Sequence, residues 1–283
     1  MTVFKNKNHL SDFIEKSKSK NLSVGLVPTM GALHDGHSSL ILEALSDNDI
    51  VVVSIFVNPT QFNNLKDLDN YPRHLSRDLD LLSSISEEYI FVYAPSAEDI
   101  YGNDISKESF DFDGLEHEME GQFRPGHFNG VGTIIKKLFQ LIKPDSAYFG
   151  EKDFQQLLIV KKLNEKEKLG VEVIGCSIYR AEDGLAMSSR NERLTENQRN
   201  QAPFIYKTLQ TAKNKFGTES ALEVKEWVID QFKNNSTLDL EYFLIADSET
   251  LKTITRKSTA KNYRAFIAVY ADDVRLIDNI ALN

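Results

Sequence analysis

The chain of 283 residues contains a single cysteine, Cys176, which excludes an intramolecular disulfide and a cysteine-based metal cluster. No apolar run approaches the ~20 residues that a membrane-spanning helix needs. Residues 1–13 lack the apolar core and the small-residue cleavage site of a signal peptide. These features predict a cytoplasmic protein that does not associate with membranes.

Positive charge is also in short supply. The 33 Lys and Arg residues against 42 Asp and Glu give 33 − 42 = −9 at pH 7, which argues against general nucleic-acid binding. Hydrophobic residues make up 41% of the chain and charged residues 27%, as in ordinary globular proteins. We therefore expect a soluble intracellular enzyme.

Strand-like and helix-like segments alternate through about the first 180 residues. Apolar runs predict strands over residues 22–27, 50–57, 89–93, 146–149 and 171–179. Amphipathic patterns predict helices over residues 38–45, 72–82, 131–142 and 154–163, with Pro72 in a first turn. Strands buried on both faces and alternating with helices predict an α/β fold, a Rossmann-like doubly wound parallel sheet, over residues 1–180.

The pattern changes near residue 180. Two helices are predicted over residues 195–216 and 219–232, and three strands over 238–245, 264–270 and 274–277. Asp272 and Asp273 form a predicted turn between the last two strands. Residues 181–283 are therefore expected to form a smaller C-terminal α+β domain.

A cluster of glycine and histidine follows the first predicted strand. The carboxyl end of a parallel strand that leads into a helix N-terminus favours phosphate binding. Gly31 and Gly36 permit close approach of a ligand, while His34 and His37 point the same way on a helical turn. Two imidazoles there can stabilise a pyrophosphate leaving group. The alternatives are two surface histidines or a metal site, and the His-x-x-His spacing disfavours the metal.

The segment His34-Asp35-Gly36-His37 resembles the HIGH-type signature of the nucleotidyltransferase superfamily. Its second signature, a flexible phosphate-binding loop, is matched by Met187-Ser188-Ser189-Arg190. Residues 56–62, 124–128 and 150–156 supply three further motifs. Together the five motifs resemble the pantoate–β-alanine ligase family over almost the whole chain.

The resemblance implies an ATP-dependent condensation of (R)-pantoate with β-alanine to pantothenate. The reaction passes through a pantoyl adenylate and releases AMP and pyrophosphate. ATP is a substrate and is expected to bring Mg²⁺ with it. The implied partners are these small molecules and a second copy of the chain in a homodimer.

The resemblance also assigns residues. The ATP contacts are Met30, Gly31, Ala32, Leu33, His34, Asp35, Gly36, His37, Gly150, Glu151, Lys152, Asp153, Tyr179, Met187, Ser188, Ser189 and Arg190. Among them His37 is the proton donor, and the other catalytic residues are His34, Lys152, Ser188, Ser189 and Arg190. Gln61 and Gln156 bind pantoate, and Gln61 also binds β-alanine. The chain supplies no metal ligand, and the smaller domain closes over the ATP site.

Some roles stay open at this point. Arg124 and His127 lie in a family motif, but either could be structural. Gln155 is expected to face away from Gln156 and to support packing. The polar segment 63–70 is a candidate mobile flap over the pantoate pocket.

Two other classes of function compete with the ligase. An adenylyltransferase would need a basic pocket for its acceptor phosphate, whereas the Gln61 and Gln156 amides suit a small hydroxy acid. A non-catalytic nucleotide-binding protein would be expected to have lost a catalytic group. A dinucleotide-dependent oxidoreductase is disfavoured, because the Gly130-Val131-Gly132 run lacks the third glycine and a preceding strand.

Overall fold

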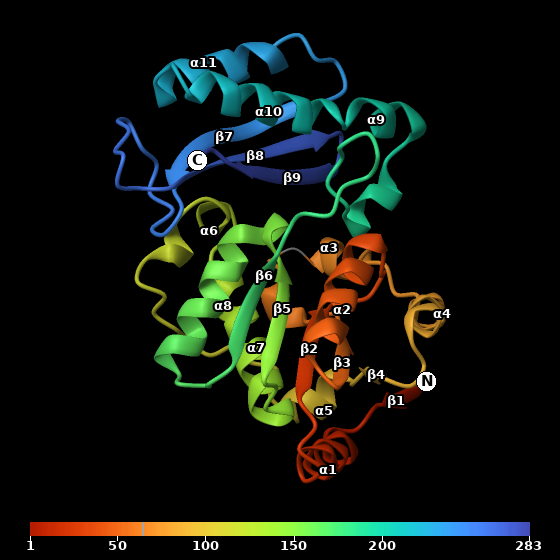
Figure 1. Cartoon of the computed structure of the whole chain (residues 1–283). Helices are drawn as coiled ribbons and strands as arrows, with labels where there is room; N and C mark the ends of the chain where they lie inside the picture. The colour runs from red at the N-terminus through yellow and green to blue at the C-terminus, as the bar shows by residue number, and fades with distance from the viewer. Residues whose placement is uncertain (64) are drawn as a thin grey trace. The chain divides into compact units, whose positions relative to one another are not determined.

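A sheet of six parallel strands, in the order β1-β4-β3-β2-β5-β6, organises the N-terminal unit, Met1–Ser177 (Figure 1). The strands are β1 (Thr2–Phe4), β2 (Val24–Thr29), β3 (Ile50–Ile55), β4 (Ile90–Tyr93), β5 (Ser146–Gly150) and β6 (Glu172–Cys176). This computed structural model describes residues 1–63 and 65–283. Because β2 lies between β3 and β5, the strand order reverses at β2 and β5. Doubly wound sheets bind ligands at the carboxyl ends of such a pair.

Helices cover both faces of this sheet. They are α1 (Lys7–Lys18), α2 (Asp35–Asp47), α3 (Leu65–Asp69), α4 (Leu75–Ile85), α5 (Ala97–Tyr101), α6 (Glu120–Phe123), α7 (His127–Ile142) and α8 (Phe154–Lys166). Ile174 of β6 packs in the same apolar cluster as Ile41 of α2. The next residue, Gly175, faces α8, because a Cβ there would lie 2.6 Å from Leu157 Cδ2. Successive strand residues point to opposite faces, so α2 and α8 lie on opposite sides, and the predicted doubly wound fold is confirmed.

The predicted end of the first strand was wrong. The expectation was a strand over residues 22–27 that stops at Pro28, but β2 continues through Pro28 to Thr29. On one side, β2 pairs with β5 only at Gly25 and Leu26. The missing N–H of Pro28 therefore costs no bond to β5, while pairing with β3 continues to Thr29.

Other predicted boundaries also differ from the structure. The helix expected from Pro72 starts at Leu75 with His74 as its N-cap, so Pro72 is not in its first turn. The strand expected over 171–179 is shorter, Glu172–Cys176. The sequence reasoning also missed β1, an edge strand of three residues, and the helix α1 that follows it.

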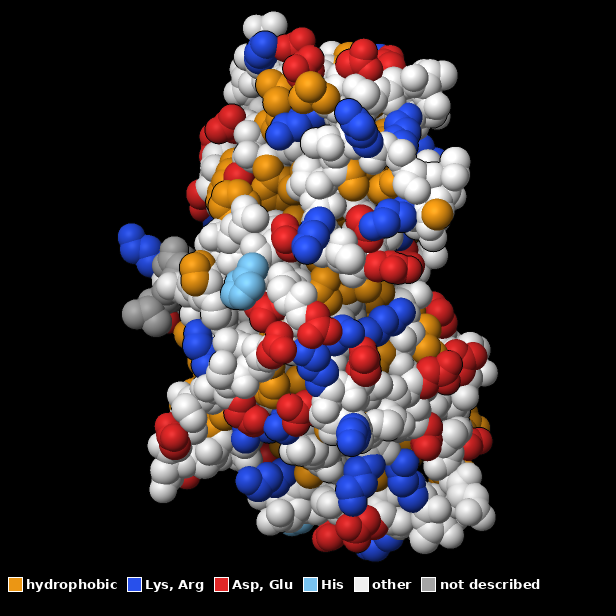
Figure 2. All heavy atoms as spheres, turned by 90° about the vertical axis from the view of Figure 1, so that its left-hand side faces the viewer, with side chains coloured by type: hydrophobic (Ala, Val, Ile, Leu, Met, Phe, Trp, Pro, Cys, Tyr) orange, Lys and Arg blue, Asp and Glu red, His pale blue; other side chains and the backbone are white. Residues whose placement is uncertain are grey.

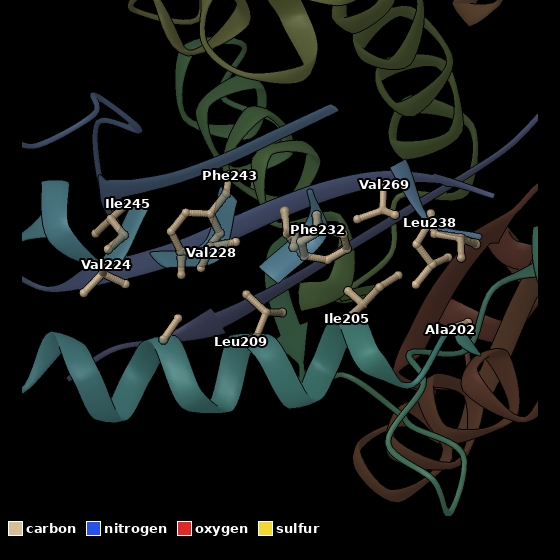
Figure 3. Packing of buried hydrophobic residues seen from close by; sticks show 14 of the residues in the cluster. Ala202, Ile205, Leu209, Val224, Val228, Phe232, Leu238, Phe243, Ile245 and Val269 are labelled. Carbon is tan, nitrogen blue, oxygen red and sulfur yellow. The ribbon is translucent and has the colours of Figure 1, made fainter. Parts of the chain in front are cut away.

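The C-terminal unit, Ile178–Asn283, is a three-stranded antiparallel sheet packed with helices. Its elements are α9 (Glu196–Gln201), α10 (Phe204–Phe216), α11 (Ala221–Phe232), β7 (Asp239–Asp247), β8 (Tyr263–Ala271) and β9 (Val274–Ala281). Figure 3 shows Leu209 of α10 and Val228 of α11 in one cluster with Phe243 of β7. The predicted smaller α+β domain is confirmed.

One predicted helix of this unit is two helices. The single helix expected over residues 195–216 is interrupted between Gln201 and Phe204. Pro203 lies in the gap as the N-cap of α10, because proline lacks the N–H that a continuous helix would need there. The predicted turn at Asp272 and Asp273 joins β8 to β9.

Asn64, which belongs to the proposed flap 63–70, lies outside the described residues. Among the helices of residues 1–63 and 65–283, none has the length and apolar character needed to cross a bilayer. The face drawn in Figure 2 carries Lys and Arg side chains interspersed with Asp and Glu.

Candidate active site

Two histidines cap the first turn of α2 reciprocally. The Gly36 N–H donates to His34 Nδ1 at 3.1 Å, and the His34 N–H donates to His37 Nδ1 at 3.3 Å. The ring centroids lie 4.0 Å apart, so the imidazoles are side by side as their spacing predicts. Because each Nδ1 accepts a hydrogen bond, Nε2 is the protonated nitrogen of each neutral ring.

Both imidazoles are held neutral at pH 7. Burial, followed by the positive charge of Lys152, lowers the pKa of His34 from 6.5 to about 4. Burial lowers the pKa of His37 to about 3, with His34 and Lys152 adding to the shift. The pair can therefore offer two Nε2–H donors to an anion without carrying charge.

The turn between β2 and α2 has an unusual backbone. Gly31 has φ +82° and Ala32 has φ +50°, a left-handed conformation that costs a non-glycine residue energy. The amide of Ala32 donates to Asp78 Oδ2 at 3.1 Å, and that of Leu33 donates to Asp78 Oδ1 at 2.7 Å. One carboxylate thus fixes the turn by accepting from two consecutive amides.

Asp78 is a residue that the sequence reasoning missed. It lies on α4 with 2% of its surface exposed, and burial raises its pKa against the opposing effect of the Leu33 and Ala32 N–H bonds. Nothing in the local sequence marks it, because its partners are 45 and 46 residues away. Since Asp78 takes these two amides, a contact of Ala32 or Leu33 with ATP would have to use other atoms.

The segment after β5 lies close to the histidine turn. Gly150 ends the strand, and Glu151, Lys152 and Asp153 form the 3₁₀ turn η3 (Glu151–Asp153) before α8. The Lys152 side chain is 17% exposed, and its Nζ lies 3.8 Å from Asp153 Oδ2. Its charge acts on both histidines, so the neighbouring strands β2 and β5 bring the two predicted ATP segments together.

Gln61 joins this group from the 3₁₀ turn η1 (Pro59–Gln61). Its buried side chain donates from Nε2 to Met30 Sδ at 3.2 Å and accepts at Oε1 from Asn58 Nδ2 at 3.1 Å. Tyr101 donates its hydroxyl to Asn58 Oδ1 at 2.5 Å. Asn58 was not among the predicted site residues, although it lies in the quoted motif 56–62.

His127 and Arg124 hold the backbone of Gln61. His127 is buried and donates from Nδ1 to the Gln61 carbonyl at 2.8 Å, and Arg124 reaches the same oxygen at 3.5 Å. Burial, with the Arg124 charge, lowers the pKa of His127 to about 4. Both residues therefore contact the backbone of Gln61, a predicted pantoate ligand.

Adjacent glutamines on α8 differ in environment. Gln155 is buried, donates to the carbonyls of Leu115 and Glu118 at 2.8 and 2.7 Å, and accepts from the Glu120 N–H at 3.1 Å. This agrees with its expected packing role. Gln156 follows it in the first turn and is partly buried.

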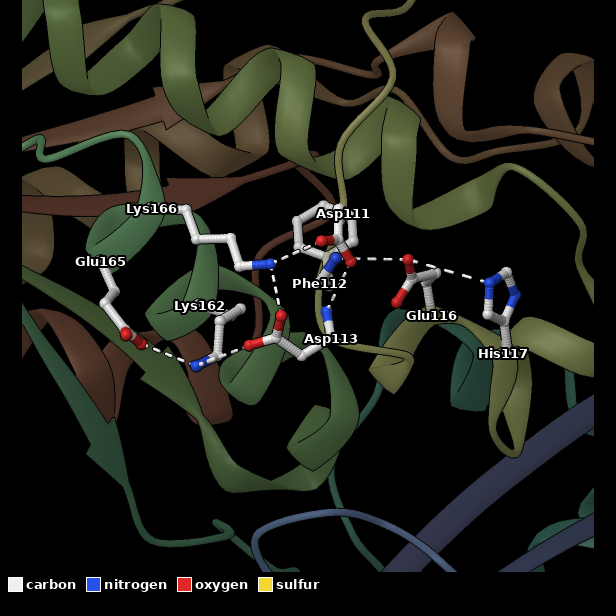
Figure 4. Close-up of polar contacts among 8 residues, drawn as sticks. All are labelled: Asp111, Phe112, Asp113, Glu116, His117, Lys162, Glu165 and Lys166. Atoms are coloured by element: carbon white, nitrogen blue, oxygen red, sulfur yellow. Dashed lines mark hydrogen bonds and ion pairs between the residues drawn. The ribbon is translucent and has the colours of Figure 1, made fainter.

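Ion pairs join the segment before α6 to helix α8. Figure 4 shows Lys166 paired with Asp111 and Asp113, and Lys162 paired with Asp113. Lys162 also pairs with Glu165 of its own helix. Such solvent-exposed pairs contribute little stability each. Gln155 is therefore the stronger anchor of this segment.

The remaining predicted residues belong to the C-terminal unit. Tyr179 is 44% exposed, and its carbonyl accepts from the Met187 N–H at 3.0 Å. Ser188 caps the 3₁₀ turn η4 (Ser189–Arg193) by accepting from the Arg190 N–H at 3.3 Å. This unit therefore brings Tyr179 together with the 187–190 loop, whereas the other predicted residues lie in Met1–Ser177.

Comparison with known proteins identifies the family of the chain. The sequence profile of the family "Pantoate-beta-alanine ligase" matches residues 2–281. The chain belongs to that family. A pantothenate synthetase of Christiangramia forsetii is 59% identical to this ligase over 283 residues, which is 100% of both chains.

Solved structures of the pantoate–β-alanine ligase family have the same fold. The pantothenate synthetase of Thermus thermophilus is 35% identical with a TM-score of 0.91, covering 100% of this chain and 99% of that one. The pantoate-beta-alanine ligase of Francisella tularensis, complexed with beta-gamma ATP and beta-alanine, is 35% identical with a TM-score of 0.81. That match covers 100% of this chain and 98% of the other. The predicted family and enzyme class, a ligase, are confirmed.

Proposed function

We propose that the chain joins (R)-pantoate to β-alanine in two steps, with ATP as the third substrate. The observation that carries the proposal is the neutral His34–His37 pair beside Lys152, at the carboxyl ends of the neighbouring strands β2 and β5. Family membership adds the substrate class, and the Francisella relative is a complex with an ATP compound and β-alanine.

In the first step the pantoate carboxylate attacks the α-phosphorus of ATP. The bond from that phosphorus to the bridging oxygen breaks, which gives pantoyl adenylate and pyrophosphate. Lys152 neutralises the phosphate charge, and the Nε2–H groups of His34 and His37 donate to oxygens of the leaving pyrophosphate. The predicted proton donor, His37, acts here as a neutral hydrogen-bond donor, because its pKa is about 3.

The nucleotide contacts are proposed from both units. In the N-terminal unit they are Met30, Gly31, Ala32, Leu33, Asp35, Gly36, Gly150, Glu151 and Asp153, with the three residues above. In the C-terminal unit they are Tyr179, Met187, Ser188, Ser189 and Arg190. The Arg190 guanidinium suits a phosphate because it stays charged and presents a planar fork of donors.

Mg²⁺ is expected to arrive with ATP, bound to phosphate oxygens and water. The carboxylate of Asp35 is exposed in the first turn of α2, and that of Asp153 is exposed beside Lys152. Among the described residues no group of three or more His, Cys, Asp or Glu could hold a metal ion by itself. These two separate carboxylates therefore suit an ion that stays bound to the phosphates and keeps several waters. When bound, the ion would offset negative charge on the phosphates.

Pantoate is proposed to bind between Gln61 and Gln156. Gln61 bonds to Met30 and Asn58 in this structure, so it would exchange those bonds for pantoate oxygens. In the second step the amine of β-alanine, also near Gln61, attacks the acyl carbon, loses a proton and displaces AMP. A homodimer, which the family resemblance implies, and a cytoplasmic location remain predictions.

The decisive experiment measures pyrophosphate released from ATP and Mg²⁺ with β-alanine omitted. The expected result is release only when pantoate is present, limited to about one equivalent per site until β-alanine is added. Folded protein that binds ATP but releases nothing with pantoate would contradict the proposal. The adenylyltransferase or the non-catalytic nucleotide-binding protein would then be favoured.

A further inference from the structure

The two predicted nucleotide segments of the C-terminal unit are the two ends of one small hairpin. The Met187 N–H donates to the Tyr179 carbonyl, Arg180 and Ala186 form an antiparallel bridge, and the Ala181 N–H donates to Leu185 at 2.9 Å. Whatever fixes this hairpin therefore fixes Tyr179 relative to the 187–190 loop.

A bidentate ion pair lies directly beside that hairpin. Arg180 donates from Nη1 to Asp278 Oδ2 at 2.6 Å and from Nη2 to Asp278 Oδ1 at 2.9 Å. The side chains are 16% and 4% exposed, so the pair is largely screened from water. Nη1 also donates to the Gly184 carbonyl at 3.1 Å, which ties the turn of the hairpin to the same guanidinium.

Tyr206 of α10 covers the pair. The Arg180 guanidinium carbon lies 3.7 Å from the centroid of the Tyr206 ring, within cation–π range. The ring also lies against Gly184, where a Cβ would come within 2.6 Å of Tyr206 Cδ1 and where φ is +94°. Only glycine suits position 184. The turn of the hairpin, Arg180 and Tyr206 therefore pack together as one stack.

The loop beyond the hairpin is anchored to the same unit. Asn191 Nδ2 donates to the Ala186 carbonyl at 3.1 Å, which folds the end of the 187–190 loop back onto the hairpin. Arg193 pairs at 2.6 Å with Asp273, which lies in the turn between β8 and β9. The loop therefore follows the C-terminal sheet as one body.

We propose that Arg180 and Asp278 are positioning residues for nucleotide binding, which hold Tyr179 and the 187–190 loop in a fixed register on strand β9. The inference rests on the proposed function for the identity of the nucleotide. Alternation along the hairpin supports it, because Tyr179 is exposed while its neighbour Arg180 points inward to Asp278. Lysine could not replace the arginine, since it lacks the fork that makes both bonds.

The test is calorimetric titration of ATP and Mg²⁺ into the full chain without pantoate, with Arg180→Lys and Asp278→Asn compared to the unmodified protein. Each variant removes a charge-assisted bond of the pair, and we expect the Kd for ATP to rise ~10-fold. The double variant should bind ATP about as weakly as either single variant, because the two substitutions disrupt the same ion pair. The KM for pantoate should stay unchanged, since its predicted ligands lie in the other unit.

Arg275→Lys is the matched control. Arg275 also lies on β9 and donates from Nε and Nη2 to Glu241 Oε2 at 2.7 and 2.6 Å, in a pair that is similarly shielded. A general loss of stability would affect both lysine variants alike, whereas positioning predicts weaker ATP binding only for Arg180→Lys. An equal rise in the Kd for ATP in Arg180→Lys and Arg275→Lys would overturn the inference. An unchanged Kd in both Arg180→Lys and Asp278→Asn would overturn it as well.

Three further outcomes relate the inference to folding and to the proposed function. If a charge variant does not fold, Tyr206→Leu tests the same stack, with an expected ~3-fold weaker Kd for ATP. If the unmodified chain binds ATP but releases no pyrophosphate with pantoate, the proposed reaction fails while the Kd values still decide the positioning. A chain that does not bind ATP overturns both.

Discussion

The carboxylate of Asp78 accepts a 2.7 Å hydrogen bond from the backbone N–H of Leu33, on the turn that leads to the histidine pair. A second bond from Ala32 stabilises that residue at φ +50°. The strained turn and the orientation of the following helix N-terminus thus depend on a side chain from another helix. Buried carboxylates that accept from backbone amides are costly to replace by neutral groups.

Asp78→Asn should therefore slow pantoate-dependent pyrophosphate release. An amide keeps the shape but has only one acceptor oxygen, so one of the two backbone N–H groups loses its partner, which costs about 1–3 kcal/mol. We expect the rate of the first step to fall roughly 10-fold to 100-fold, because small misplacements of the reacting groups have effects of this size. A rapid-quench assay of single-turnover pyrophosphate release checks it.

Asp80→Asn is the control for that variant. Asp80 is exposed on the same helix, and its substitution makes the same change of charge. Its rate should equal that of the unmodified chain. A normal rate in Asp78→Asn would show that the turn keeps its shape without the second bond.

His37 has two separable roles, as a cap acceptor at Nδ1 and as a donor at Nε2. Asparagine places an oxygen near the Nδ1 position, and glutamine places an N–H near the Nε2 position. We expect His37→Asn to fold normally and to form the adenylate ~10²–10⁴-fold more slowly, and His37→Gln to keep more activity. Thermal unfolding and pyrophosphate release check the two roles. If both variants had equal activity, the Nε2–H donor would make no contribution to the rate of adenylate formation.

Lys152 is expected to act on the phosphate and on the histidines together. Lys152→Gln removes the positive charge that lowers the pKa of His34, so that pKa should rise. The first step should slow by a factor comparable to His37→Asn, while the reaction of supplied pantoyl adenylate with β-alanine should stay near normal. NMR titration of the histidines and the two half-reactions measure these effects. A variant in which only the β-alanine step slowed would contradict the role assigned to Lys152.

The sequence was sufficient for those parts of the fold and the site that depend on nearby residues. The strand–turn–helix around His34 and His37 was predictable from glycine, histidine and strand signals within about one turn of the chain. The short edge strand β1 gave no such signal, because three residues are too few for a pattern. The sequence contains Pro203, but the amphipathic pattern on both sides of it predicts one continuous helix, whereas the structure has two.

The contacts that the sequence could not predict join distant segments. Arg180 pairs with Asp278 over 98 residues, and His127 bonds to the Gln61 carbonyl over 66 residues. In each case the partner is chosen by the tertiary fold, and the residue type alone allows a surface position equally well. Only the structure could show that His127 serves the backbone of Gln61.

The neutral histidine pair predicts how stability changes with pH. Both pKa values lie below 6.5, so between pH 6.5 and about 4 the unfolded chain binds protons that the folded chain does not. Stability should therefore fall as the pH drops through this window, by at most about 1.4 kcal/mol per pH unit for each histidine. Urea unfolding at pH 7.5, 6.0 and 5.0 should show a smaller loss for His37→Asn than for the unmodified chain. His9→Asn, which changes an exposed histidine of α1, should follow the unmodified chain, and identical pH profiles of all three proteins would show that His37 is not held neutral by the fold.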